Sequence, residues 1–214
     1  YEYRKNLGFQ LARETDIEAD MVVPVPDSGV PAALGFAEFS KKKFELGLIR
    51  NHYVGRTFIE PTQSIRQFGV KLKHSVNVSY IKNKKVILID DSIVRGTTAK
   101  KIVKMVYEAG AKEVHLGVSC PPITHPDFYG IDTPNYDELI ASNKNIDEMS
   151  SMIGTKSLFF LSLNGTYRAM GCEERDGNCP QFTDHCFTGE YPTPLVDMEQ
   201  GNVSKQYSLL TEKS

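Results

Sequence analysis

The most constraining feature of the sequence is a run of branched apolar residues that ends at two adjacent acids. Residues 86–89 read VILI, Asp90 and Asp91 follow, and four more residues lead to a Gly-Thr-Thr step at 96–98. An apolar run without alternation is typical of a strand buried on both faces. An apolar stripe at helical spacing follows over 97–109 and ends at Gly110. The segment therefore predicts a strand, a loop and a helix of an α/β fold.

Other strands and helices alternate in the same way along the chain. Residues 21–25 and 113–119 are short apolar runs that predict strands, and the first leads through turn residues into a helical pattern. This alternation predicts an α/β fold whose central, mostly parallel sheet is flanked by helices. Further segments predict an amphipathic helix over 1–14, a strand over 44–50, a long loop over 51–77, helical turns at 136–141 and 146–152, and a short apolar segment at 157–162.

The C-terminal part differs in amino-acid composition. Residues 167–199 are polar and contain glycines and prolines, so we expect irregular structure that lies over the domain. The expected organisation is a domain over 1–165, an irregular segment over 166–200 packed on it, and a frayed tail over 201–214.

Charge is concentrated in one segment. Residues 41–85 contain 11 lysines and arginines against two acids, a net charge of +9. Because the whole chain has a net charge of −2, the remaining residues together carry −11. Such a run can be a solvated face, a nucleic-acid contact or a site for a small polyphosphate. Aromatic side chains are sparse there, which disfavours nucleic acid.

Composition and cysteine content favour a reduced, water-soluble protein. No run approaches the roughly 20 apolar residues of a membrane span, and no secretion signal is visible, so we expect no membrane partner and a cytoplasmic location. The four cysteines Cys120, Cys172, Cys179 and Cys186 match no close-paired metal motif. The five histidines also lack a ligand spacing, which favours surface or satisfied histidines.

The acids and the loop after them suit one kind of ligand. Ligands of α/β sheets bind at the carboxyl ends of strands, and a helix that starts there presents backbone N–H groups to a phosphate. Adjacent carboxylates accept hydrogen bonds from vicinal sugar hydroxyls, and they also suit Mg²⁺. A ribose 5′-phosphate satisfies both parts. For Asp90 and Asp91 alone, a helix cap and a solvated turn would be an adequate explanation.

The whole string resembles the phosphoribosyl-diphosphate (PRPP) signature of type I phosphoribosyltransferases. Longer blocks resemble glutamine PRPP amidotransferases, the amidophosphoribosyltransferase family: NHYVGRTFIEPTQSIRQ at 51–67, SCPPITHPDFYGID at 119–132, ELIAS at 138–142 and CFTGEYPTP at 186–194. The resemblance implies a type I phosphoribosyltransferase fold and a glycosyltransferase of the pentosyltransferase class. It implies that ammonia displaces diphosphate from PRPP to give 5-phosphoribosylamine, the first step of purine synthesis.

The resemblance also implies roles for individual residues. Asp90 and Asp91 hold the ribose hydroxyls and Mg²⁺, and Ser28 is a third contact to the metal. Diphosphate is held by the turn Pro26, Asp27, Ser28 and Gly29. The 5′-phosphate is held by Ser92, Ile93, Val94, Arg95, Gly96, Thr97 and Thr98. Arg56 and Lys73 engage the diphosphate, and Tyr53 and Lys71 belong to the loop that closes over it.

Partners and cofactors follow from the same resemblance. The full enzymes carry an N-terminal glutaminase domain that delivers ammonia, and we expect that domain to be absent from this chain. Purine nucleotides are expected inhibitors, and a homo-oligomer is expected. Many members hold a [4Fe–4S] cluster, but Asp127, Thr183 and Cys186 stand at three of the relevant positions. Two thiolates are therefore missing, and we expect no cluster.

Two other functions are compatible with the motif. A phosphoribosyltransferase that uses a nucleobase would need a hood that recognises the base, and the block at 186–194 speaks against it. A non-catalytic module that senses PRPP or purine nucleotides would keep Asp90, Asp91 and the phosphate loop. It could lose the basic loop, so Arg56 and Lys73 favour the enzyme.

Overall fold

The computed structural model describes residues 1–51, 74–131 and 133–195. Its centre is a five-stranded sheet in the order β2-β1-β5-β6-β7, in which every neighbouring pair is parallel. A separate antiparallel pair, β3 with β4, lies beside it. The strands are β1 Met21–Pro24, β2 Lys43–Phe44, β3 Leu48–Arg50, β4 His74–Val76, β5 Lys85–Asp90, β6 Glu113–Val118 and β7 Ser157–Phe160.

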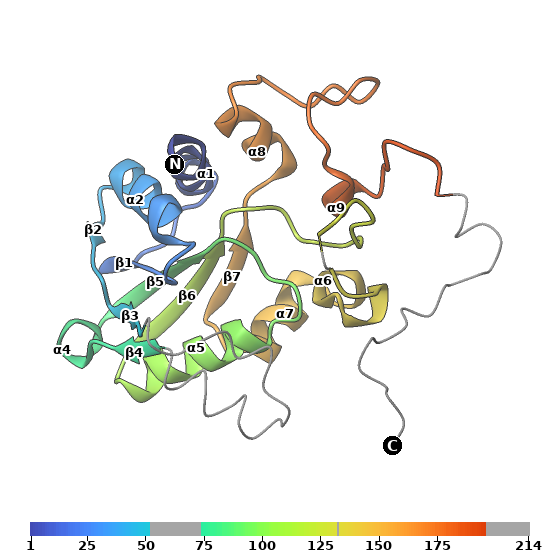
Figure 1. Cartoon of the computed structure of the whole chain (residues 1–214). Coiled ribbons are helices and arrows are strands. Elements are labelled where there is room, and N and C mark those ends of the chain that lie inside the picture. The colour runs from blue at the N-terminus through green and yellow to red at the C-terminus, as the bar shows by residue number, and fades with distance from the viewer. Residues whose placement is uncertain (52–73, 132, 196–214) are drawn as a thin grey trace, which may run out of the picture.

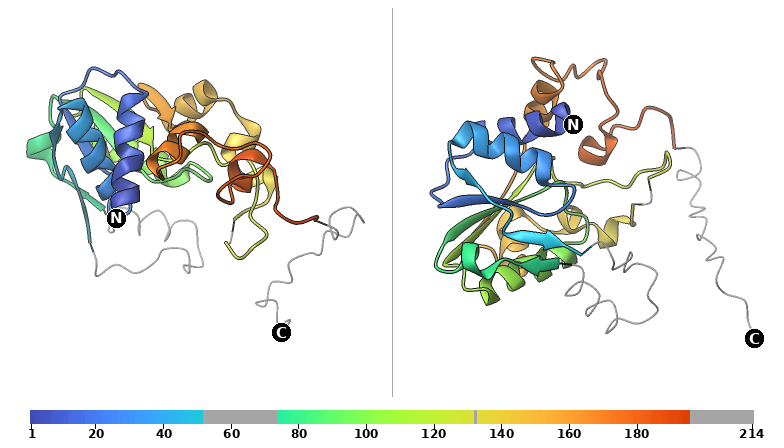
Figure 2. Two further views of the ribbon diagram at one scale, coloured as in Figure 1. Left: turned by 90° about the horizontal axis from the view of Figure 1, so that it is seen from above. Right: turned by 60° about the vertical axis from the view of Figure 1, so that its left-hand side comes forward.

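Helices cover both faces of the sheet. Figure 1 shows α1 and α2 on one side and α5 and α7 on the other. Shorter helices lie around the C-terminal part, and the views in Figure 2 show α8 beside α1. The helices are α1 Glu2–Arg13, α2 Val30–Ser40, α4 Val78–Ile81, α5 Thr97–Glu108, η2 Tyr136–Glu138 (a 3-10 turn), α6 Ile140–Asn143, α7 Ile146–Ile153, α8 Leu163–Ala169 and α9 His185–Thr188.

The central strand β5 explains the layering. Its residues 86–89 are all fully buried, and they alternate between two cores. Ile87 and Ile89 pack toward the α1–α2 layer with Phe36, whereas Val86 and Leu88 belong to the larger core on the other face. The predicted doubly buried strand is therefore confirmed.

Helices α1 and α2 pack unusually closely through glycine. A Cβ atom on Gly8 would lie 1.7 Å from the carbonyl oxygen of Ala32, and one on Gly35 would lie 1.9 Å from that of Lys5. Only hydrogen fits at these two crossing points, which brings the helix backbones into contact. Leu11 and Ala12 complete the buried face of α1, as the amphipathic pattern predicts.

Several sequence-based boundaries are wrong in detail. The predicted strand over 44–50 is split between β2 and β3 of different sheets, and Gly47 lies between them against the side chains of Val23 and Ile81. The predicted loop over 51–77 contains β4, and the predicted irregular segment over 167–199 contains the end of α8 and all of α9. The helical turn predicted over 136–141 is the short pair η2 and α6. The segment 146–152 is confirmed as α7, with a capping box at Asn145.

Among the described residues, no helix has both the length and the apolar character needed to cross a membrane.

Candidate functional site

The two predicted ligand loops meet at one edge of the sheet. Strands β1 and β5 are neighbours in parallel register, with Pro24 opposite Ile89, so both loops leave at carboxyl ends. The N–H of Val25 donates to the carbonyl of Ile89 over 2.8 Å. A Cβ on Gly29 would lie 2.3 Å from that same carbonyl oxygen. The turn at 26–29 is thus packed directly against the residue that precedes Asp90.

Asp90 is a buried carboxyl beside a second acid. It is 8% exposed, and its Oδ1 accepts the backbone N–H of Asp91 over 2.9 Å. Burial, and after it the negative charge of Asp91, raise the pKa of Asp90 to about 8. A cation or a hydroxyl donor placed between the two acids would stabilise the charged pair. The donor set consists of hard oxygen atoms, and it therefore fits Mg²⁺.

The loop after the acids forms the start of α5. Gly96 precedes the helix at a φ of +73°, where side chains are disfavoured, and a Cβ there would lie 3.0 Å from Ile140 Cδ1. Thr97 and Thr98 are exposed in the first turn of a 12-residue helix, whose leading N–H groups have no intrahelical acceptor. The geometry suits an anion.

Not every residue of this loop points at a ligand. Ile93 is 3% exposed and belongs to the core, so only its backbone is available. The carbonyl of Val94 accepts the N–H of Ile140 over 3.0 Å. The Arg95 side chain is about half exposed and bonds Glu138 with an Nε–Oε2 distance of 2.5 Å. Its charge is paired with that of Glu138 in this structure.

The turn at 26–29 carries an ion pair. Asp27 is exposed and bonds the Arg50 guanidinium over 2.5 Å, while Ser28 is half buried. Arg50 is the last residue of β3 and pairs with His74 of β4. The segment between these two strands therefore leaves and returns beside the turn. Tyr53, Arg56, Lys71 and Lys73 lie outside the described residues.

Comparison with known proteins decides the family. The model of the phosphoribosyl transferase domain family matches residues 5–140, which is more than half of the chain. The chain belongs to the phosphoribosyltransferase domain family. This match includes both loops at the sheet edge, and the structure has the parallel sheet and flanking helices predicted for the type I fold.

Related enzymes narrow the similarity further. The chain is 59% identical over 211 residues to an amidophosphoribosyltransferase of Rhizobium etli, and this match covers 98% of the chain and 42% of the relative. It is 52% identical over 192 residues to the Bacillus subtilis amidophosphoribosyltransferase, covering 90% of the chain and 40% of that protein. The predicted resemblance to this enzyme family is confirmed. The chain spans about two fifths of the length of these relatives.

A solved structure agrees with the family match and with the two related enzymes. Glutamine PRPP amidotransferase from B. subtilis, complexed with ADP and GMP, superposes with a TM-score of 0.80 at 51% sequence identity. The match covers 90% of this chain and 42% of that one. The predicted type I phosphoribosyltransferase fold is confirmed.

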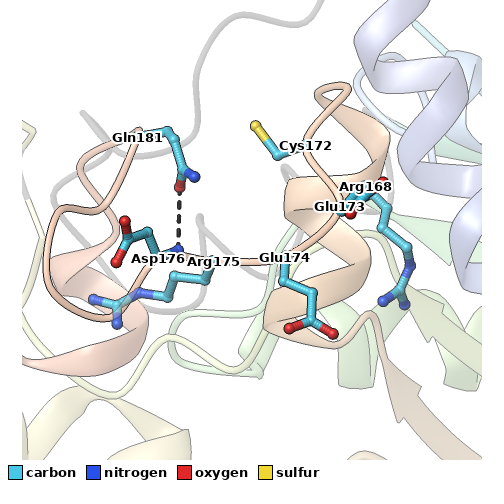
Figure 3. A pocket seen from close by; sticks show the side chains of 7 residues that line it. All are labelled: Arg168, Cys172, Glu173, Glu174, Arg175, Asp176 and Gln181. Atoms are coloured by element: carbon cyan, nitrogen blue, oxygen red, sulfur yellow. Dashed lines mark hydrogen bonds between the residues drawn. The ribbon is translucent and has the colours of Figure 1, made fainter.

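A hollow of about 620 Å³ lies elsewhere on this member of the family, in its C-terminal part. It is open to solvent between α8 and the following segment, and Figure 3 shows acidic and basic side chains around it. Its lining residues are Arg168, Cys172, Glu173, Glu174, Arg175, Asp176 and Gln181. None of them is a predicted site residue. Arg175 is already bonded to buried Asp184 over 2.6 Å, so its charge is not available to a ligand in this hollow.

Two residues that contact the acids or the loop after them were not predicted from the sequence. Ser119 is 3% exposed, and both its N–H and its hydroxyl donate to the carbonyl of Asp90. Its position directly after β6 was a usable signal, because parallel neighbours end at the same edge. Glu138, the partner of Arg95, does not directly follow a strand, so its position in the sequence did not indicate a role in the site.

Proposed function

We propose that this chain is the phosphoribosyl-transfer part of an amidophosphoribosyltransferase. The reaction joins ammonia to PRPP and releases diphosphate, giving 5-phosphoribosylamine at the start of purine synthesis. The observation that carries the proposal is the buried Asp90 at the end of β5 with Asp91 next to it, followed after four residues by Gly96 and the start of α5. The high identity to amidophosphoribosyltransferases supports this activity over transfer to a nucleobase.

Binding of the phosphoribosyl group uses the two acids and the loop that follows them. The carboxylates of Asp90 and Asp91 accept hydrogen bonds from the ribose 2- and 3-hydroxyls. The 5′-phosphate lies on the backbone N–H groups and hydroxyls of residues 92–98, at the start of α5. Arg95 is held by Glu138 in this structure, and we propose that it turns to the phosphate when substrate binds.

Diphosphate lies on the other loop. The turn at 26–29 is packed on β5, so a diphosphate on C1 of the ribose reaches it while the ribose contacts Asp90. Ser28, Asp90 and Asp91 would hold Mg²⁺, which would neutralise charge on the leaving diphosphate. From the basic loop outside the described residues, Arg56 and Lys73 would contact the diphosphate, with Tyr53 and Lys71 in the covering segment.

The transfer itself needs no protein nucleophile. The lone pair of ammonia forms the bond to C1, the C1–O bond breaks with its electron pair on diphosphate, and the amine loses a proton. The transition state carries positive charge on the sugar ring, close to the acids that hold its hydroxyls. Cys120 lies beside these acids, but burial raises the pKa of its thiol, which keeps it protonated.

The ammonia source and the regulation are proposed from the relatives. The chain covers about two fifths of their length, and we propose that a glutaminase domain supplies ammonia in the complete protein. The B. subtilis structure is complexed with ADP and GMP, and we propose that purine nucleotides inhibit this chain too. We also propose a cytoplasmic homo-oligomer whose transferase domain comprises residues 1–165, with the segment 166–200 packed on it. The end of that segment, 196–200, and the predicted tail 201–214 lie outside the described residues.

The test is diphosphate release. Purified chain, PRPP, Mg²⁺ and ammonium chloride at mildly alkaline pH should release diphosphate, and glutamine should not replace ammonium. Asp91→Asn should lower the rate at least about 100-fold, a loss of about 3 kcal/mol of transition-state stabilisation. Asp147→Asn, an acid on the surface helix α7, is the matched control and should leave the rate unchanged.

Other outcomes identify the alternatives. Equilibrium binding of PRPP without diphosphate release under any of these conditions would favour a sensing module. Release that requires a purine base and not ammonium would identify a nucleobase phosphoribosyltransferase.

A further inference from the structure

The short segment 136–143 packs directly on the loop that is proposed to hold the 5′-phosphate. The N–H of Ile140 donates to the carbonyl of Val94 over 3.0 Å, and a Cβ on Gly96 would lie 3.0 Å from Ile140 Cδ1. Leu139 is fully buried. The backbone that carries Glu138 is therefore fixed relative to residues 92–98.

The same segment is held by further hydrogen bonds away from the phosphate loop. Asn143 Nδ2 donates to the carbonyls of Tyr136 and Leu139 over 2.8 and 2.9 Å. The hydroxyl of Ser142 donates to the carbonyl of Thr124, in the loop after β6. These bonds keep the turn η2 in place, so the Glu138 carboxylate is attached to a fixed support.

Glu138 pairs with the cation of the phosphate loop. Arg95 is the one lysine or arginine among residues 92–98, and its Nε lies 2.5 Å from Glu138 Oε2. The two side chains are 48% and 54% exposed. An ion pair this exposed contributes little net free energy, so Arg95 can exchange it for a stronger partner at low cost.

A phosphate group is such a stronger partner. A phosphate monoester carries about −1.5 to −2 charges at pH 7, and its oxygens accept two parallel hydrogen bonds from one guanidinium. At the start of α5 it would lie beside Gly96, the residue that follows Arg95. The Glu138 carboxylate carries a single charge on a half-exposed side chain. Arg95 therefore has two competing anionic partners, one in the free protein and one in the complex.

A purely structural role for Glu138 is the alternative. The ion pair would then fasten η2 to the phosphate loop, and its loss would lower stability without a specific effect on phosphate binding. However, the segment is already fastened by the bond between Ile140 and Val94 and by the buried Leu139. An exposed ion pair adds little to these contacts.

We propose that Glu138 is a positioning residue that sets the affinity of the 5′-phosphate site. It holds Arg95 as a counter-ion in the free protein and releases it when a doubly charged sugar phosphate binds. The inference rests on the proposed function, because it takes residues 92–98 as the phosphate site. Removing this carboxylate should therefore strengthen binding, whereas removing a group that contacts the substrate should weaken it.

The experiment is calorimetric titration of the whole chain with ribose 5-phosphate and Mg²⁺ at pH 8. Glu138→Gln should bind the sugar phosphate about 2–5-fold more tightly than the wild type, the range that corresponds to one exposed ion pair. Asp137→Asn removes the same charge from the neighbouring exposed position of η2, and it is the matched control that should bind with unchanged affinity.

A double-mutant cycle tests whether Glu138 acts through Arg95. Arg95→Gln should weaken binding, and Glu138→Gln should give no gain in that background. In the transferase assay with ammonium, Glu138→Gln should lower KM for PRPP by the same factor and leave kcat unchanged.

Unchanged or weaker binding by Glu138→Gln would overturn the proposal. An equal gain in Asp137→Asn, or a gain that persists without Arg95, would also overturn it, because the effect would then be one of general charge. If the wild type binds no ribose 5-phosphate, the proposed phosphate site fails, and this inference fails with it. If the wild type binds the ligand and Glu138→Gln binds it equally well, only the role of Glu138 is wrong.

Discussion

Replacing Asp90 with asparagine should stabilise the unliganded protein, and the gain should grow with pH. Asp90 is 8% exposed, and its pKa is raised from 3.8 to about 8. Well below pH 4 the carboxyl is protonated in both the folded and the unfolded state. Between about pH 4 and 8 the unfolded chain loses the proton and the folded chain keeps it, so folding becomes less favourable as pH rises. Asparagine does not titrate and avoids this loss.

The magnitude follows from the pKa difference. Each tenfold change in acidity corresponds to about 1.4 kcal/mol, so the upper bound is about 5–6 kcal/mol above pH 8. Local water penetration and relaxation reduce such values, and we expect about 2–4 kcal/mol at pH 8. For a chain of this length that is an increase in Tm of roughly 5–15 °C. The amide oxygen can still accept the N–H of Asp91, so that backbone donor keeps its partner.

The assay is thermal unfolding from pH 4.5 to 8.5 without divalent cations or PRPP. Asp16→Asn, at an exposed position, is the control and should show no pH-dependent gain. A stability difference that is the same at every pH, or an Asp90→Asn variant less stable than wild type at pH 8, would refute the assignment of Asp90 as a buried, destabilising carboxyl.

Two further predictions test the packing of the site and of the C-terminal segment. Gly29→Ala should destabilise the protein by about 1–3 kcal/mol in urea unfolding and weaken PRPP binding, because the added Cβ would lie 2.3 Å from the carbonyl oxygen of Ile89. The control is Gly177→Ala, whose Cβ would meet no atom within 4 Å. Equal effects of the two substitutions would contradict the close approach of Gly29 to Ile89. Arg175→Ala should cost about 3–5 kcal/mol at pH 7, because it leaves the buried Asp184 without its cation. Burial alone would raise the pKa of Asp184, but Arg175 and the Tyr167 hydroxyl hold it below its usual range, so the loss should shrink as pH falls below about 4. A loss that does not change with pH would show that Arg175 acts through packing alone.

The parts of the fold that were predictable depend on local pattern. Residues 86–89 are apolar without interruption because β5 is covered on both faces. The first acid after this run, Asp90, therefore marks the end of the strand. The general rule that ligands bind at carboxyl ends then locates both loops. Helix α7 was predicted over 146–152, and its capping box, which the structure shows at Asn145 and Glu148, is equally local.

The parts that were not predictable depend on contacts between distant segments. Strands β3 and β4 are three residues each, and they pair across a long intervening segment. No periodicity can show such short elements. Asp127 and His185 are 58 residues apart, so their bond left no spacing to recognise. The bond between Arg95 and Glu138 also joins distant residues, 43 positions apart. The sequence alone suggested only that the Arg95 cation lies beside a phosphate.

The most direct test of the central claim is a crystal structure of this chain with ribose 5-phosphate and Mg²⁺. We predict the phosphate on the N–H groups of residues 92–98, with the sugar hydroxyls on Asp90 and Asp91. A sugar phosphate bound instead among the charged side chains of the hollow near Arg168, with the Asp90–Asp91 pair facing only water, would contradict it.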